Sequence, residues 1–138
     1  MKLANAPCSW GALEFDLEGK APAYEQVLNE INETGYAGTE LGDWGFMPTD
    51  PDRLRAEIAK RNLELLGAFV PVALANEQAH AEGIQKALQT AGLMYNAGYK
   101  NAFIVLADEN GTNAFRTKNA GRINGYGGLS ADEMKTFA

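Results

Sequence analysis

A set of aromatic, acidic and basic residues follows the short apolar segments of this sequence. Trp10, Glu40 and Asp108 each come at or just after the end of such a segment, and Arg122 lies in the polar stretch after the last of them. An aromatic face stacks on the C–H-rich side of a polyhydroxylated ring, while carboxylates and a guanidinium hold hydroxyl groups or a phosphate. These residue types predict the wall of a site for a sugar-like ligand, if the fold brings them to one rim.

Each of these residues also has a structural interpretation. Glu40 stands among apolar residues, where a carboxylate is either paired or faces a wet cavity. Trp10 and Trp44 fit a pocket wall and ordinary packing equally well. Asp108 fits the end of a strand, and Arg122 fits a solvated loop. The two interpretations differ in whether these side chains share one cavity.

The sequence offers little for metal or nucleophilic chemistry. It contains one His and one Cys, so a metal site built from these two residue types is not expected. Cys8 is predicted to be a small buried residue with no His nearby to activate it. His80 is predicted to lie on the surface, in the first turns of a helix and away from the strand ends. No spacing supports a carboxylate-only Mg²⁺ site. We therefore predict no metal site within this chain.

Four apolar segments have the character of strands. They are expected at 2–7, at 36–41, within 63–74 and at 101–107, and they recur at the spacing of one βα unit. The third is nearly continuous in its apolar character, which is typical of a parallel strand covered on both faces. In parallel sheets ligands bind at the carboxyl ends of the strands, where the candidate residues stand.

Helix signals separate the strands. An apolar stripe and Pro22 predict a first helix that ends at Gly35, and Asp50 and Asn76 are expected to cap the second and third helices. Ser130 opens a capping box for a fourth, truncated helix. Polar loops are expected at 14–20 and 108–129. The third helix is expected to bury one apolar stripe, which consists of Ile84, Ala87, Leu88, Ala91 and Tyr95.

This alternation predicts an α/β fold with about four parallel strands, three full helices and a truncated fourth. Parallel strands with right-handed crossovers form either an open doubly wound sheet or a closed barrel. The segment 7–11, Pro-Cys-Ser-Trp-Gly, follows the first strand and matches neither a dinucleotide fingerprint nor a phosphate-binding loop. This lowers the nucleotide-binding interpretation without excluding other open-sheet proteins, so both architectures stay open at this point.

The bulk composition narrows the class of protein further. An apolar content of 46% is enough to build a core, and the net charge of −6 argues against a nucleic-acid partner. No secretory signal is evident, and no run approaches the ~18–20 apolar residues of a membrane span. A single cysteine suits a reducing compartment. We expect a cytoplasmic protein without nucleic-acid or membrane partners.

Three segments carry a resemblance to a known family. Residues 6–11 (Ala-Pro-Cys-Ser-Trp-Gly), 35–42 (Gly-Tyr-Ala-Gly-Thr-Glu-Leu-Gly) and 120–122 (Ala-Gly-Arg) resemble the first half of a xylose isomerase-like TIM barrel. The sequence is most similar to the sugar phosphate isomerase/epimerase and inosose dehydratase group. The resemblance implies that residues 1–138 form one partial (β/α)8 barrel domain, its N-terminal half. The resemblance implies a divalent metal, Mn²⁺, Co²⁺ or Mg²⁺, held by residues of later strands that are absent from this chain. It implies a substrate wall at Trp10 and Glu40, with Asp108 and Arg122 as further contributors.

The resemblance implies the N-terminal part of a metal-dependent sugar (phosphate) isomerase or epimerase, or of an inosose dehydratase-like enzyme. Such a chain would bind a sugar or cyclitol and be inactive alone, because the metal polarises the substrate while a carboxylate moves its proton. The alternative is a non-catalytic carbohydrate-binding or structural fragment. The unpaired flanks of the first and fourth strands also predict association between copies of the chain.

Overall fold

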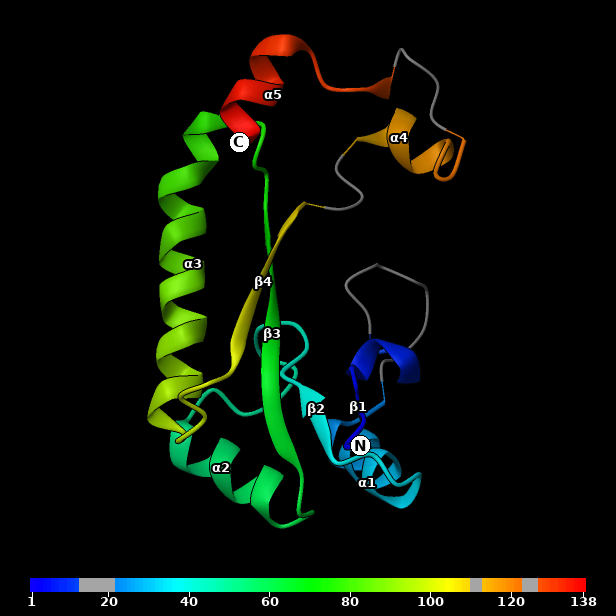
Figure 1. The fold of residues 1–138 in the computed structure, drawn as a ribbon, viewed down its shortest axis with the longest axis vertical. Helices are drawn as coiled ribbons and strands as arrows, with labels where there is room; N and C mark the ends of the chain where they lie inside the picture. Colours follow the sequence, from blue (N-terminus) through cyan, green and yellow to red (C-terminus); the bar gives the residue numbers. More distant parts are fainter. Residues whose placement is uncertain (13–21, 110–112, 123–126) are drawn as a thin grey trace.

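Four parallel strands form one sheet in the computed structural model, which describes residues 1–12, 22–109, 113–122 and 127–138. The strands are neighbours in chain order (Figure 1): β1 (Ala4–Asn5), β2 (Gly38–Glu40), β3 (Glu64–Val72) and β4 (Phe103–Asp108). The predicted loop at 14–20 and parts of the predicted loop at 108–129 lie outside the described residues.

The second, third and last helices begin at the predicted capping residues, and Gly35 follows the first helix as predicted, but Pro22 precedes the N-cap of that helix, Ala23. The side chains of Asp50, Asn76 and Ser130 each accept a hydrogen bond from the first turn of a helix, and Ser130 closes its capping box with Glu133. Within the described ranges, no helix is both long and apolar enough to cross a membrane. The helices are α1 (Tyr24–Glu33), α2 (Pro51–Ala59), α3 (Glu77–Asn96), α4 (Ala114–Lys118) and α5 (Ala131–Phe137).

Three local predictions were wrong. The first strand is shorter than expected because Pro7 begins a 3-10 helix, η1 (Pro7–Trp10), and this turn leaves Cys8 exposed rather than buried. The second strand begins only at Gly38. Part of the expected polar loop at 108–129 is the helix α4, which begins where the Asn113 side chain accepts a hydrogen bond from Arg116 N–H. A single capping residue was the available signal for that helix.

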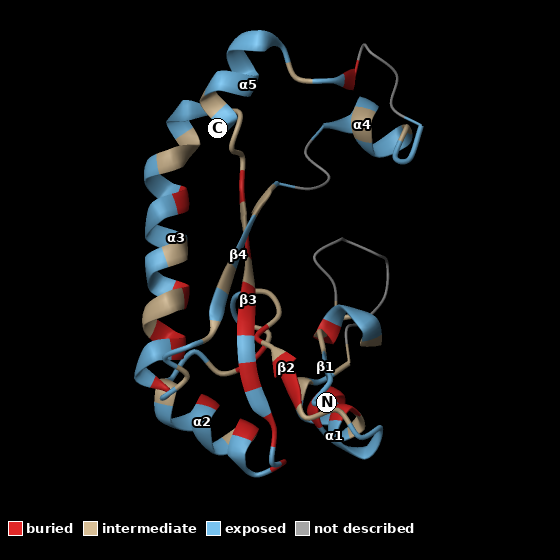
Figure 2. Cartoon of the chain, in the orientation of Figure 1, coloured by how far each residue is buried: buried red, intermediate tan, exposed pale blue. Residues whose placement is uncertain are grey.

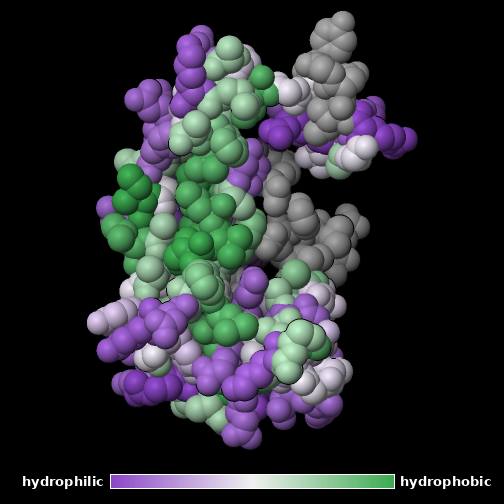
Figure 3. Space-filling view, in the orientation of Figure 1, coloured by the Kyte–Doolittle hydropathy of each residue, from purple (hydrophilic) through white to green (hydrophobic). Residues whose placement is uncertain are grey.

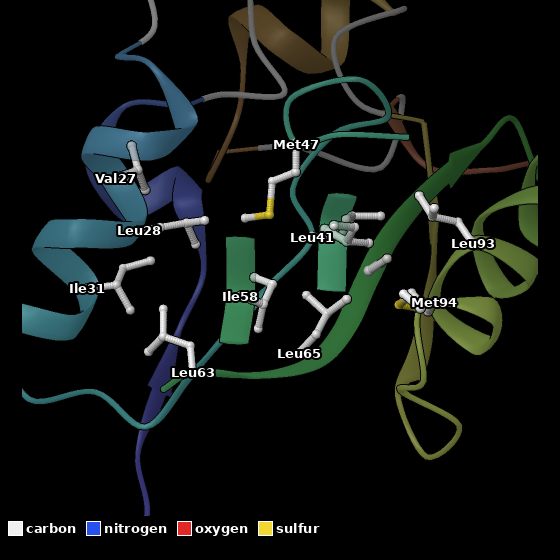
Figure 4. Close-up of a cluster of buried hydrophobic side chains, with 13 residues drawn as sticks. Val27, Leu28, Ile31, Leu41, Met47, Ile58, Leu63, Leu65, Leu93 and Met94 are labelled. Atoms are coloured by element: carbon white, nitrogen blue, oxygen red, sulfur yellow. The ribbon is translucent and has the colours of Figure 1, made fainter. Parts of the chain in front are cut away.

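The hydrophobic core lies on one face of the sheet. Side chains from α1, α2 and α3 meet those of β2 and β3 in a single cluster, for example Leu28, Ile58, Leu65 and Met94 (Figure 4). On the other face Leu66 is exposed and Phe69 only half-buried, so β3 is not covered on both faces as predicted. Strands in sequential order with helices on one face form part of a barrel rather than a doubly wound sheet.

A register shift between Thr39 and Glu40 controls the shape of the sheet. Thr39 pairs with Leu65 but Glu40 pairs with Gly67, so β3 holds an extra residue at this point. Leu65 and Ala68 consequently both enter the core cluster, although simple alternation would turn them to opposite faces. Because β2 ends at Glu40, none of the described strands lies beside the edge of β3 beyond Gly67 on this side.

The apolar stripe predicted to be the buried side of α3 is exposed. Ile84, Leu88 and Tyr95 all face solvent, whereas the buried positions of the helix include Gly83 and Met94. Gly83 sets this orientation, since a Cβ atom there would lie 2.5 Å from a methyl group of Val72 on β3. Helical periodicity identifies a stripe but not the surface that covers it, and no described element covers this one.

The packing of α1 against α2 depends on a buried arginine that the sequence did not indicate. The guanidinium of Arg61 donates to Asn29 Oδ1 at 2.6 Å and to Glu57 Oε2 at 2.7 Å, and it also donates to the carbonyl oxygens of Glu57 and Glu25. Its hydrogen bond to Glu57 lowers the pKa of that carboxyl, with the positive charge adding to the effect. Arg61 thus fixes the end of α2 to α1 through satisfied polar contacts.

Candidate functional site at the carboxyl ends of the strands

Two of the four predicted site residues end strands, but they lie at different heights along the sheet. Glu40 is the last residue of β2 and pairs with Gly67, whereas Asp108 is the last residue of β4 and pairs with Val72. At about 3.3 Å per residue along β3, the two positions are separated by roughly 16 Å in the strand direction. The carboxylates of Glu40 and Asp108 therefore do not converge on one small group.

Glu40 lies on the open face of the sheet. Its neighbour Thr39 is fully buried on the helix-covered side, so strand alternation turns Glu40 to the opposite side, where it is half-buried. In the described ranges its carboxylate makes no hydrogen bond or ion pair with another side chain. A carboxylate so placed remains available to accept hydrogen bonds from a ligand.

The carboxylate of Asp108 already interacts with other residues of the protein. Its Oδ1 accepts a hydrogen bond from the backbone N–H of Leu74 at 3.2 Å, and its Oδ2 lies 3.6 Å from Nη1 of Arg116 on α4. The carbonyl oxygen of Leu74 lies 2.8 Å from Nε2 of His80. His80 is therefore half-buried at the carboxyl end of β3, and its predicted surface position away from the strand ends was wrong. Asp108 and His80 together fix the β3–α3 connection.

Trp10 and Arg122 each make contacts of their own within the protein. Trp10 packs edge-on against Tyr36, with ring centroids 6.2 Å apart and planes at 80°, and it also contacts the hydrophobic core. Arg122 is exposed after α4, and its backbone N–H donates to the carbonyl of Asn119. That all four predicted residues line one site stays a prediction.

A cleft of about 450 Å³ opens where β2 ends and β3 continues. The chain turns away from the sheet at Gly42, whose φ of +74° is in the left-handed region that favours glycine. The space lies between the loop after β2, the free edge of β3 and one side of α3. Its apolar wall comes from Leu41, Trp44, Phe69, Val70 and Pro71, and its polar groups from Asp43, Lys86, Gln89, Thr90 and Glu109.

The polar groups of this cleft differ in whether they already interact with other side chains of the protein. Burial raises the pKa of the Asp43 carboxyl, and no ion pair within the described residues compensates for it. Thr90 is only 7% exposed, and its hydroxyl has no hydrogen-bond partner among the residues that the structure describes. Lys86, by contrast, is held by Glu82 at 3.0 Å. The Asp43 carboxyl and the Thr90 hydroxyl can therefore bind ligand hydroxyls, while Trp44 offers an exposed aromatic face.

Sequence reasoning located part of this cleft. Trp44 follows the second strand and was considered in the sequence as part of a pocket wall; it lines the cleft together with its neighbour Asp43. The contributions of α3 were missed, although Lys86, Gln89 and Thr90 fall at i, i+3 and i+4 and so share one side of a helix. This polar strip was a usable signal, but only the tertiary structure shows that it faces the end of β2.

No family model matches the chain. The chain does match individual curated proteins. The chain is 39% identical over 69 residues to the inosose dehydratase of Salmonella typhimurium (strain LT2), a match that covers 50% of this chain and 22% of the relative. Over this segment the chain is similar to an inosose dehydratase. The inosose dehydratase of Geobacillus kaustophilus is 30% identical over 105 residues, covering 75% of this chain and 33% of the relative.

A third inosose dehydratase, from Lactiplantibacillus plantarum, is 36% identical over 69 residues, or 50% of this chain and 22% of the relative. The matched segments thus span between 22% and 33% of the length of these relatives. The inosose dehydratase-like resemblance recognised in the sequence is confirmed, and it agrees with the partial barrel that the fold displays.

Proposed function

We propose that this chain is part of an inosose dehydratase-like enzyme and supplies one wall of a site for a sugar or cyclitol. The observation that carries the proposal is the 39% identity to an inosose dehydratase over 69 residues. The structure supports it because the cleft lies at the carboxyl ends of parallel strands, where ligands bind in such folds. The sugar phosphate isomerase and epimerase assignments, in which the ligand would carry a phosphate, stay predictions.

The role proposed for each residue follows from its position in or beside the cleft. The cleft is lined from Leu41 onward, one residue beyond Glu40, and Glu40 itself is not among its lining residues. Trp44 stacks on the ring of the ligand, and the Asp43 carboxyl with the Thr90 hydroxyl holds ring hydroxyls. Glu40 accepts a hydrogen bond from a ligand hydroxyl on the open face of the sheet. The roles of Trp10, Asp108 and Arg122 in binding stay predictions.

The expected divalent metal does not fit the described residues. They bring no three His, Cys, Asp or Glu side chains together as a group that could hold an ion. We therefore assign binding and orientation to this part of the molecule and derive no step through a metal. We propose that the chain alone does not turn over an inosose.

Calorimetric titration with myo-inositol and with an inosose tests the binding role. The wild-type chain is expected to bind, and Glu40→Gln and Asp43→Asn are each expected to weaken binding by roughly 10- to 150-fold, the effect of one lost charge-assisted hydrogen bond of roughly 1.5–3 kcal/mol. Glu33→Gln, an exposed change on α1, serves as the control. Equal affinity in all three variants would count against the proposed wall.

A second candidate function is a carbohydrate-binding module without catalysis. The absence of a metal-ligand group among the described residues favours it over a self-sufficient enzyme. A fusion of this chain to the unmatched part of the Geobacillus relative distinguishes the two. Turnover of an inosose by the fusion, lost on Glu40→Gln, supports the enzyme. Binding without turnover by a folded fusion supports the module.

A further inference from the structure

The charged side chains of the cleft leave an excess of negative charge. Two acids, Asp43 and Glu109, line it together with a single cation, Lys86. The ammonium group of Lys86 is already neutralised, since its Nζ lies 3.0 Å from Oε1 of Glu82. Within the described ranges, neither Asp43 nor Glu109 takes part in an ion pair. The charge that a ligand meets in this cleft is therefore negative.

The position of the cleft strengthens this charge. The cleft opens beside β2 and β3, the two inner strands of the sheet, and Glu109 is held at the end of β3 because its backbone N–H donates to the carbonyl of Val72 at 3.0 Å. Buried residues are concentrated on these two strands (Figure 2), and hydrophobic atoms gather over β3, β4 and α3 (Figure 3). Charges bordered by apolar groups are screened less by water than charges on an open polar surface.

Two further groups of the cleft indicate the kind of cation that would fit. Trp44 is 46% exposed, and the face of an indole ring attracts an ammonium group that lies within about 6 Å. Thr90 is buried, and its hydroxyl, without a partner among the described residues, suits a ligand hydroxyl. Carboxylates, an aromatic face and a hydroxyl together match an amine that is carried on a polyhydroxylated ring.

We propose that the cleft binds a protonated primary amine on a sugar or cyclitol ring, with Asp43 and Glu109 holding the ammonium group and Trp44 stacking on the ring. This inference rests on the proposed function and narrows its ligand to an aminated ring, in which the ammonium group replaces one of the hydroxyls assigned to Asp43. Burial raises the pKa of the Asp43 carboxyl, and a bound ammonium group compensates the buried negative charge.

Calorimetric titration with two matched ligands tests the inference. They are myo-inositol and an inosamine, in which one hydroxyl of the same ring is replaced by a primary amine. The wild-type chain is expected to bind the inosamine about tenfold more tightly. The N-acetylated inosamine keeps the nitrogen but not the charge and should lose this preference, and high salt should reduce it. Glucosamine against glucose, run in parallel, decides whether the preferred amine is carried on a sugar or a cyclitol.

Charge variants of the cleft sharpen the test. Lys86→Gln removes the cation from the lining and releases Glu82, so the affinity for the inosamine should rise about threefold. Lys60→Gln makes the same charge change at an exposed position after α2, outside the cleft, and should leave the affinity unchanged. Glu109→Gln should lower the preference about threefold, with Glu33→Gln as its control. A gain of affinity in Lys86→Gln cannot come from a loss of folding.

The outcomes separate this inference from the proposed function. Equal affinities for the inosamine and myo-inositol would overturn the inference alone and leave the binding wall standing. If neither compound binds to the folded wild-type chain, the proposed wall fails and the inference fails with it. Equal effects of Lys86→Gln and Lys60→Gln would show attraction to the whole chain rather than to the cleft, and this result also overturns the inference.

Discussion

Two sides of the molecule, one around α1, α2 and β3 and the other around β4 and the outer surface of α3, differ in how completely they are packed. On the first, apolar side chains such as Leu28 and Ile58 are fully buried, and the buried guanidinium of Arg61 donates hydrogen bonds from all three of its nitrogens. On the second, large apolar side chains face solvent. The packed side accounts for most of the stability of the chain, and the open side contributes less to it. Substitutions on the two sides should therefore have different costs.

The largest loss of stability is expected for Leu28→Ala on the packed side. Leu28 is 0% exposed within the core cluster, and truncation of a fully buried leucine costs about 3 kcal/mol of unfolding free energy because it leaves a cavity. The same change at Leu3, which is 55% exposed, should cost less than about 0.5 kcal/mol. Urea denaturation followed by circular dichroism measures both, and similar costs would contradict the assignment of the core.

The next largest effect is expected for Arg61→Ala. This change removes a side chain that is only 6% exposed, leaves the half-buried Glu57 without its donor and should cost roughly 2–3 kcal/mol. Arg55→Ala is the control: Arg55 pairs with Asp52 at the exposed surface of α2, and loss of that pair should cost less than about 0.5 kcal/mol. If the two variants unfold at the same urea concentration, the role of Arg61 at the α1–α2 contact is disproved.

Two glycines of α3 sharpen the comparison within a single helix. Gly83→Ala places a methyl group 2.5 Å from Val72 and should destabilise the chain by about 1–2 kcal/mol, despite the better helix propensity of alanine. Gly92→Ala adds a methyl group in open space, so it should stabilise the chain by up to about 1 kcal/mol. Thermal unfolding of the two variants gives opposite shifts if α3 is oriented as described.

The smallest expected effects are those of pH. The pKa of Glu57 is lowered by Arg61, so its contribution to stability is present above its ordinary pKa of 4.5 and is lost as the pH falls towards the lowered value. The pKa of Asp43 is raised by burial, so its contribution favours the fold at acid pH and is lost as the pH rises above 3.8 through the raised value.

Urea midpoints of Glu57→Gln and Asp43→Asn, recorded from acid to neutral pH, test these directions. Glu57→Gln should be less stable than the wild type at neutral pH and about equally stable at acid pH. Asp43→Asn should be more stable than the wild type at neutral pH. Parallel curves for the two variants would show that these carboxyl groups do not have the opposite environments that the structure gives them.

Prediction from the sequence succeeded where the signal is local. Asp50, Asn76 and Ser130 cap helices because the oxygen of a capping side chain reaches N–H groups within its own first turn, whatever surrounds the helix. Prediction failed where contacts with another part of the molecule decide how far a residue is buried. Cys8 was expected to be buried because of its residue type, but the turn that Pro7 starts exposes it. His80 was expected on the surface, but the end of β3 brings the carbonyl of Leu74 to it.

The sequence by itself determined the α/β class, the order of strands and helices, most capping residues and the inosose dehydratase-like resemblance, since all of these depend on neighbouring residues or on the order of residues along the chain. Only the tertiary structure decided that Glu40 and Asp108 stand apart and that Asp43, Trp44 and Thr90 share a cleft. The physical reason is that these distances follow from the extra residue in β3 and from the close approach of α3 at Gly83. Both depend on contacts between segments that are remote in the sequence.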